Sequence, residues 1–358
     1  MSKVLTIIIP TYNMEEYLHK CLASLLIDDH LLALVEVLII NDGSEDRSSE
    51  IALSFVKKYP DVFKLIEKEN GNYGSCVNRG LKEARGKYVK LLDADDEFVT
   101  DAFARLVFIL QTLNVDLVLS DVRSYDTDGN QIRVSKYPIP NNKILSYDDA
   151  FCPELISGLF MHNITYLTAL VIGMNYRQTE GIFYTDNEWA FVPMLNVKTL
   201  YYHNEIVYSY LRGRPGQTMD PVIRSENWIH DVIGIRAMVK GIIDVRFDTF
   251  KKECFIFGKL LERIRLTYGG FLFDLKNKSV IAKEKDKRAL VDLDSYIIEN
   301  HPVLSQKMED LSYGILMKHF IRKWRNSHYE KSFSACKRYL RFRYFLRKYN
   351  THCLLRRN

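Results

Sequence analysis

The chain has 358 residues, of which 47% are hydrophobic and 27% charged, and its formal net charge is +5. These values are ordinary for a soluble globular protein, and the length suggests about two domains. The six cysteines are scattered without a C-x-x-C pair, which argues against a zinc site or a disulfide framework and fits a reducing cytosol.

Strands and helices are predicted to alternate along the first hundred residues. Short β-branched runs indicate buried strands, and Pro10 is expected to end the first of them. Alternation of this kind predicts an α/β fold with a mostly parallel sheet and helices on both faces. The predicted elements are strand 4–9, helix 17–25, strand 35–40, helix 48–59, strand 63–67, helix 75–84 and strand 88–92.

Three carboxylates, those of Asp93, Asp95 and Asp96, directly follow the last of these strands. Like charges this close repel one another, and a cation between them relieves the repulsion. Mg²⁺ prefers a few carboxylate oxygens together with substrate phosphate oxygens. Asp42 follows an earlier strand, and such sheets bind ligands beyond the carboxyl ends of their strands. The pattern therefore predicts a nucleotide and metal–diphosphate site, and the alternative is a solvated acidic turn.

Four sequence blocks, in their order and spacing, resemble the family 2 glycosyltransferases of the GT-A fold. The resemblance implies a GT-A, Rossmann-like domain over residues 1–219, with a mostly parallel sheet flanked by helices. A further segment, 161–166, is similar to members that build bacterial capsular or exopolysaccharides. The four blocks are Ile8-Ile9-Pro10-Thr11-Tyr12-Asn13, Ile40-Asn41-Asp42-Gly43-Ser44, residues 70–86 with Gly74, Asn78 and Gly80, and Leu92-Asp93-Ala94-Asp95-Asp96.

The resemblance implies a nucleotide-sugar donor, expected to be a UDP-sugar, and a divalent cation, Mn²⁺ or Mg²⁺. Asp42 is expected to accept the uracil N3–H, although it could instead form an Asx-turn before a glycine. Asp95 is expected to hold the cation, and Asp93 to be the second ligand or to face the ribose. For Asn78 and Arg79 the alternative is an exposed polar helix face. The other expected donor contacts are Pro10, Thr11, Tyr12 and Ala94.

The family's general base lies in an E-D motif, which is Thr185-Asp186 in this chain. Asp186 is expected to take the proton of the acceptor hydroxyl as that hydroxyl attacks the anomeric carbon, which inverts the configuration there. Glu188 is a rival base, and Asp186 could instead be a carboxylate favoured by a helix N-terminus. His162 is either structural or an acceptor contact. The arginines of loop 210–218 either clamp the diphosphate or are merely solvated.

Two classes of function remain open. The first is a metal-dependent, inverting, hexosyltransferase-type glycosyltransferase of bacterial cell-surface polysaccharide synthesis, with a glycan or a lipid-linked acceptor. The second is a non-catalytic nucleotide-binding or scaffold protein with the same fold. A nucleotidyltransferase is disfavoured because no basic, glycine-rich loop follows the first strand. A processive synthase is disfavoured because the chain has no Q-x-x-R-W motif and no run near eighteen apolar residues.

The region 220–358 is predicted to be helical, with helices over 227–240 and 249–266, and to end in a basic tail. Such a basic amphipathic helix can lie on an anionic membrane, or its aromatic stripe can pack on the protein. With no secretory signal visible, we expect a cytoplasmic protein, peripheral on the inner face of the cell membrane. No nucleic-acid partner is predicted. One sector of the tail helix carries Tyr339, Phe342, Phe345, Leu346 and Tyr349.

Overall fold

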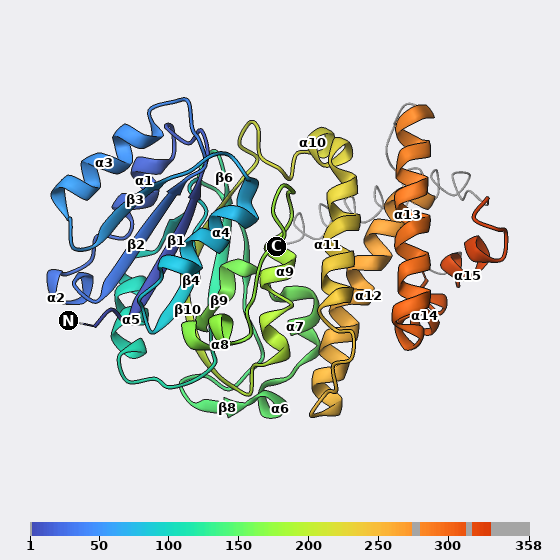
Figure 1. Ribbon diagram of the computed structural model, residues 1–358. Coiled ribbons are helices and arrows are strands. Elements are labelled where there is room, and N and C mark those ends of the chain that lie inside the picture. Colours follow the sequence, from blue (N-terminus) through green and yellow to red (C-terminus); the bar gives the residue numbers. More distant parts are fainter. Residues whose placement is uncertain (1, 274–279, 313–316, 331–358) are drawn as a thin grey trace, which may run out of the picture. The chain divides into compact units, whose positions relative to one another are not determined.

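The computed structural model describes residues 2–273, 280–312 and 317–330 (Figure 1). The chain divides into two compact units. The first contains the chain up to residue 224 together with residues 244–259, and the second contains residues 225–243 and the chain from residue 260 onward. The predicted functional boundary between residues 219 and 220 stays a prediction.

A ten-stranded sheet forms the first unit, in the order β3-β2-β1-β4-β9-β6-β10-β5, with β7 paired to β6 and β8 to β10. Neighbours are parallel from β3 to β4, and β10 is parallel to β6, whereas β9 is antiparallel to both of its neighbours. The predicted α/β fold is confirmed. The strands are β1 (Leu5–Thr11), β2 (Val35–Asn41), β3 (Phe63–Glu67), β4 (Tyr88–Leu91), β5 (Glu97–Phe98), β6 (Leu117–Asp126), β7 (Gln131–Ser135), β8 (Ile144–Ser146), β9 (Ile164–Leu167) and β10 (Thr199–Arg212).

Helices lie against the sheet because the strands carry apolar side chains on both faces, and β1 and β2 are buried along their whole length. At Gly80 a Cβ atom would lie 2.5 Å from Ile8 Cγ2, so the absence of a side chain lets a helix lie directly on β1. The helical elements of the first unit are α1 (Leu18–Ala23), α2 (Asp29–Leu32), α3 (Ser48–Lys58), α4 (Asn72–Glu83), α5 (Thr100–Leu110), α6 (Tyr147–Ala150), α7 (Pro153–Gly158), η1 (Met161–Asn163), α8 (Thr168–Gly173), α9 (Asp186–Trp189) and η2 (Pro193–Leu195).

Strand β1 runs through Pro10 to Thr11, so the prediction that Pro10 ends the strand is wrong. The Ile8 carbonyl accepts the Leu92 N–H at 3.0 Å, which shows that Ile8 faces β4. Pro10, two residues on, faces the same side, beyond the last register pair of β1 with β4 at Ile8 and Leu91. Its missing N–H therefore removes no ladder hydrogen bond, which is the situation in which a strand tolerates proline.

The second unit is helical, which confirms the predicted helical C-terminal region. None of the described helices is long and apolar enough to cross a membrane. The predicted amphipathic tail lies outside the described residues.

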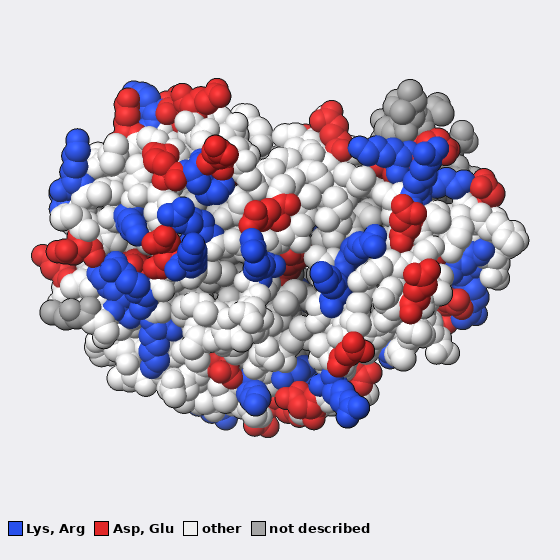
Figure 2. Space-filling view, viewed as in Figure 1, with Lys and Arg blue, Asp and Glu red and all other residues white. Residues whose placement is uncertain are grey.

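On the face of the molecule shown in Figure 2, basic and acidic side chains are interspersed. The helices are α10 (Pro221–Glu226), which begins in the first unit, α11 (Trp228–Lys240), α12 (Phe250–Leu272), whose first turns belong to the first unit, α13 (Val280–Asn300), α14 (Pro302–Glu309) and α15 (Phe320–Arg325).

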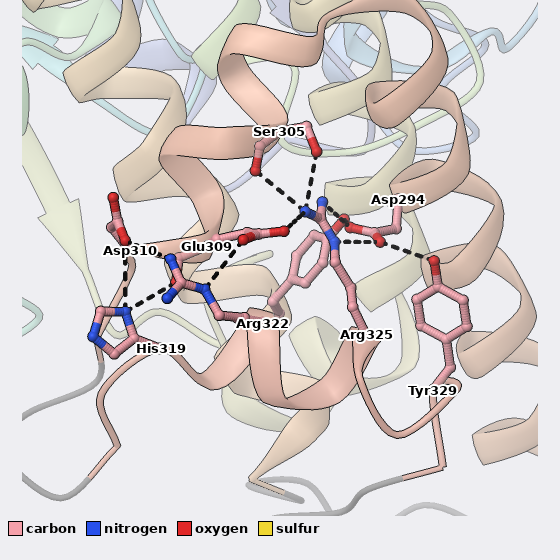
Figure 3. Close-up of polar contacts among 9 residues, drawn as sticks. Asp294, Ser305, Glu309, Asp310, His319, Arg322, Arg325 and Tyr329 are labelled. Atoms are coloured by element: carbon pink, nitrogen blue, oxygen red, sulfur yellow. Dashed lines mark hydrogen bonds and ion pairs between the residues drawn. The ribbon is translucent and has the colours of Figure 1, made fainter.

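A buried ion pair joins α13 and α15 of the second unit, and residues of α12 and α14 also contact it (Figure 3). The Arg325 guanidinium donates to both carboxylate oxygens of Asp294, at 2.8 and 2.9 Å, and the Asp294 side chain is fully buried. Tyr268 and Tyr329 donate their hydroxyls to the same carboxylate at 3.1 and 3.3 Å, and Arg325 also donates to Ser305. Each buried charge is therefore matched by hydrogen bonds.

Asp294→Ala is expected to lower the free energy of unfolding by about 3 kcal/mol, because it leaves the Arg325 charge buried without its main partner. The matched control is Arg322→Ala on α15, the helix that carries Arg325. Arg322 pairs with Glu309 and Asp310 at the surface, where 44% of its side chain is exposed, and such pairs contribute at most about 1 kcal/mol. Urea unfolding followed by circular dichroism measures both variants, and equal losses would contradict the buried-pair argument.

Candidate active site

Asp93 lies in the turn after β4, at the carboxyl end of the parallel strands. Its Oδ1 accepts the Tyr73 hydroxyl at 2.8 Å, and its backbone N–H donates to the Tyr208 hydroxyl at 3.1 Å. Its Oδ2 lies 3.7 Å from His162 Nε2. About a quarter of the side chain, 23%, is exposed. One oxygen of Asp93 is thus fixed by protein, while the other faces the partly open rim of the sheet.

Asp96 is the most buried of the three carboxylates. Its Oδ2 accepts the Tyr208 hydroxyl and its Oδ1 accepts the Leu211 N–H, both at 2.7 Å. Burial, together with the charges of Asp95 and Asp93, raises the pKa of Asp96 well above its usual range. These contacts join the turn to β10, so Asp96 holds the site together.

Asp95 pairs with Arg214, which lies in the predicted clamp loop after β10. Both side chains are largely buried, and the guanidinium also lies over the Tyr17 ring, 5.2 Å from its centroid. Burial and the charge of Asp93 raise the pKa of Asp95, and Arg214 opposes this effect. Gln217 fixes the loop base, accepting from Gly213 N–H and donating to the Leu211 carbonyl. The loop therefore delivers a cationic group to the predicted metal ligand.

Asp42 is buried at the end of β2, where its Oδ1 contacts Lys68 Nζ at 2.5 Å and accepts the Gly71 N–H at 3.0 Å. The neighbouring Asn41, rather than Asp42, makes a side-chain hydrogen bond to the backbone of this turn: its Oδ1 accepts the Ser44 N–H at 3.2 Å. The Asp42 carboxylate is therefore held by Lys68 and Gly71 rather than by the turn in which it lies.

The other expected donor contacts lie in three places: the end of β1, the acidic turn and α4. Thr11 is buried beside Asp42, whose N–H donates to the Thr11 carbonyl at 2.8 Å, and Tyr12 is 47% exposed on the same rim. Pro10 belongs to the same strand end, and Ala94 is buried within the acidic turn. Asn78 and Arg79 lie on α4, and both have partners within the protein. Arg79 donates to Glu83, and Asn78 contacts the backbone of Gln178. Their contact with the donor stays a prediction.

Asp186 is the first residue of the short helix α9 and is half-buried. Its charge contributes to the high pKa of the Tyr73 phenol, whose hydroxyl holds Asp93. Glu188 is 2% exposed, and its Oε2 accepts the N–H and the hydroxyl of Thr179 at 2.9 and 3.0 Å. Burial raises the pKa of Glu188 to about 7. Of the two base candidates, Asp186 is therefore the more accessible.

Asp93, Asp96 and His162 offer ligand atoms within 4.8 Å of one another in the described part of the chain. The carboxylate oxygens of this group, rather than the imidazole, are the ligands that Mg²⁺ or Mn²⁺ prefers. Asp96 already accepts two hydrogen bonds, whereas Asp93 Oδ2 has room for a further partner. The residues present fit a divalent cation on Asp93 and, once Arg214 moves, on Asp95.

Sequence reasoning did not single out Tyr73, Lys68 or Lys90. Lys90 is fully buried in β4, donates to the carbonyls of His162 and Ile164 at 2.8 and 3.1 Å, and so holds the segment that carries His162. Burial lowers the pKa of Lys90 to about 7. A charged residue inside an apolar strand run was a signal that could have drawn attention to Lys90. No pattern marked Tyr73.

Residues 6–169 match the family model described as Glycosyl transferase family 2. An uncharacterized glycosyltransferase of Mycoplasma genitalium is 41% identical over 217 residues, covering 60% of this chain and 69% of that protein. Its Mycoplasma pneumoniae homologue is 42% identical over 103 residues, 28% of this chain, and the match spans only 34% of that relative. Residues 1–349 of Staphylococcus aureus TarS share the fold, with 18% identity over 94% of this chain and 91% of that one and a TM-score of 0.68.

Proposed function

The chain belongs to the family 2 glycosyltransferases, and from this membership we propose that it transfers a sugar from a nucleotide-sugar to an acceptor hydroxyl. The observation that carries the proposal is the meeting of Asp42, Asp93 and Asp95 at one edge of the sheet, with Asp186 near Tyr73, the partner of Asp93. An edge of this kind is where such sheets bind nucleotides. A scaffold protein would need no carboxylate beside the donor site.

The proposed donor is a UDP-sugar. Asp42 offers its remaining acceptor capacity to the uracil N3–H, and Thr11 and Tyr12 lie beside it to line the base and ribose. The TarS structures include complexes with UDP and UDP-GlcNAc, which supports the choice of nucleotide. The choice of sugar depends on residues that contact the hexose, and the screen described below reads it out directly.

In the proposed reaction Asp95 and Asp93 hold the divalent cation. When bound there, Mn²⁺ or Mg²⁺ supplies positive charge that stabilises the leaving nucleoside diphosphate. The acceptor oxygen forms a bond to the anomeric carbon as the sugar–phosphate bond breaks, and the hydroxyl proton passes to Asp186. Direct displacement with a single base inverts the anomeric configuration. The bonding electrons of the broken bond leave with the diphosphate.

The proposed acceptor is a glycan or a lipid-linked oligosaccharide of a bacterial cell-surface polysaccharide. Attachment of the basic tail to the inner face of the membrane would bring the enzyme to a lipid-linked acceptor. This part of the proposal rests on the sequence, because the tail lies outside the described residues.

A screen of nucleotide-sugars with Mn²⁺ or Mg²⁺, read by release of free nucleotide, tests the proposal. We expect release from one UDP-sugar, faster with an acceptor and lost on chelation of the metal. UDP binding without release from any donor, with acceptors supplied, would favour the scaffold protein. Release that survives chelation would contradict the proposed metal dependence but not the proposed sugar transfer.

Arg214→Gln is expected to tighten Mn²⁺ binding to the nucleotide-free protein. A guanidinium that occupies Asp95 for about nine-tenths of the time weakens the apparent metal affinity about tenfold. The same variant should bind UDP more weakly in the presence of Mn²⁺, because the displaced guanidinium no longer reaches the diphosphate. Calorimetry measures both affinities. Arg212→Gln, at the exposed last residue of β10, is the matched control. Unchanged or weaker Mn²⁺ binding by Arg214→Gln would exclude competition for Asp95.

A further inference from the structure

Tyr73 lies in the first turn of α4, at the point where the helix faces the acidic turn. Its hydroxyl donates to Asp93 Oδ1 at 2.8 Å and lies 3.2 Å from Met161 Sδ. The phenol O–H is therefore the hydrogen-bond donor that holds the Asp93 carboxylate.

The same turn of α4 holds the segment that carries the proposed base. Gly71, which precedes the helix, accepts the Gly181 N–H at 3.0 Å. A Cβ atom at Gly74 would lie 2.0 Å from the Thr179 carbonyl oxygen, so only glycine lets the segment approach this closely. One turn further on, Asn78 accepts the Gln178 N–H at 2.8 Å and donates to its carbonyl at 2.9 Å. Segment 178–181 is thus docked directly on α4.

Two internal contacts transmit this docking to Asp186. Thr179 donates twice to Glu188, which lies in α9. Gln178 Nε2 donates to Thr185 Oγ1 at 2.8 Å, and Thr185 directly precedes Asp186. Asp186 is therefore held by the contacts within segment 178–188, and this segment is in turn held by the first two turns of α4.

We propose that Tyr73 is a positioning residue that fixes the Asp93 carboxylate relative to Asp186, with the first turn of α4 as their common support. This inference rests on the proposed function. Holding Oδ1 leaves Oδ2 directed toward His162 and the donor site, and prevents the carboxylate from rotating. The distance between the carboxylate that faces the donor and the proposed base is then set by one helix, α4, rather than by two loops that move independently.

Tyr73→Phe tests this role, because it keeps the ring and removes only the hydroxyl. Hydrogen bonds to charged groups contribute about 1.5–3 kcal/mol, so UDP binding in the presence of Mn²⁺ should weaken at least about tenfold. The matched control is Tyr137→Phe. Tyr137 is also buried, and its hydroxyl donates to the Gly158 carbonyl at 2.9 Å rather than to a carboxylate. Calorimetry with UDP and Mn²⁺ gives the UDP affinities of both variants. Thermal unfolding measures how much stability each variant loses with its buried hydroxyl.

A double-mutant cycle with Asp93→Asn separates positioning from a general loss of structure. If Tyr73 acts through Asp93, Tyr73→Phe should weaken UDP binding in the wild-type background and change it by less than about twofold in the Asp93→Asn background. Equal effects in both backgrounds, or affinity unchanged by Tyr73→Phe, would overturn the inference. Failure of the wild-type protein to bind any nucleotide with Mn²⁺ would instead reject the proposed function, and the Tyr73 role would fall with it.

Discussion

Asp186→Asn is expected to lower kcat by about a hundredfold to ten-thousandfold, the usual contribution of a general base. The substitution keeps the shape of the side chain but removes its basicity. UDP binding should persist, because the proposed donor contacts lie on Asp42, Asp93 and Asp95. The structure favours Asp186 over Glu188 because Asp186 is half-buried near Tyr73, whereas one oxygen of Glu188 is held by Thr179 in the interior.

The control for this prediction is Glu188→Gln, measured for turnover and for UDP affinity in the same assay. Because Glu188 supports segment 178–188, we expect its replacement to lower stability more than it lowers turnover per folded molecule. If Asp186→Asn keeps near-normal turnover and Glu188→Gln does not, Glu188 is the base. If both variants turn over normally, no carboxylate of α9 takes the proton.

Asp95→Ala is expected to abolish the metal-dependent part of UDP binding. Asp95 is the proposed cation ligand, and its side chain is 9% exposed at the rim rather than part of the apolar core. Its removal leaves the Arg214 guanidinium without this partner and is expected to lower stability, so circular dichroism is used to verify that the variant is folded. Calorimetry with UDP, with and without Mn²⁺, measures the difference between the two affinities, and that difference should vanish in the variant.

Asp96→Ala provides the contrast, because Asp96 is buried and joins the turn to Tyr208 and Leu211 of β10. We expect this variant to lose stability, since an unsatisfied buried group costs about 1–3 kcal/mol. If Asp95→Ala retains metal-dependent UDP binding, the cation is held elsewhere. The cluster of Asp93, Asp96 and His162 would then be the ligand set to test, through His162→Ala.

The sequence by itself determined the first four strands and the edge of the sheet at which the candidate site lies. Strands β2 and β4 were predicted from short, mainly apolar runs, because a strand buried on both faces needs apolar side chains along most of its length. Strand β3, with Lys64 and Glu67 exposed, was predicted from its three apolar residues. In a parallel sheet the carboxyl ends of the strands share one edge. The positions of Asp42 and Asp93, each directly after a strand, therefore followed from local pattern and connectivity alone.

The tertiary structure decided the partners of those carboxylates. Arg214 is 119 positions from Asp95, and Asn78 is 100 positions from the backbone that it holds. Pairings at such separations depend on how loops and helices pack, which no local periodicity encodes. The strand end at Pro10 was mispredicted for a related reason, since proline breaks a strand only where a neighbour needs its N–H, and β4 has already ended there. The sequence thus located the carboxylates, and the packing of α4, segment 178–188 and the loop after β10 determined which groups surround them.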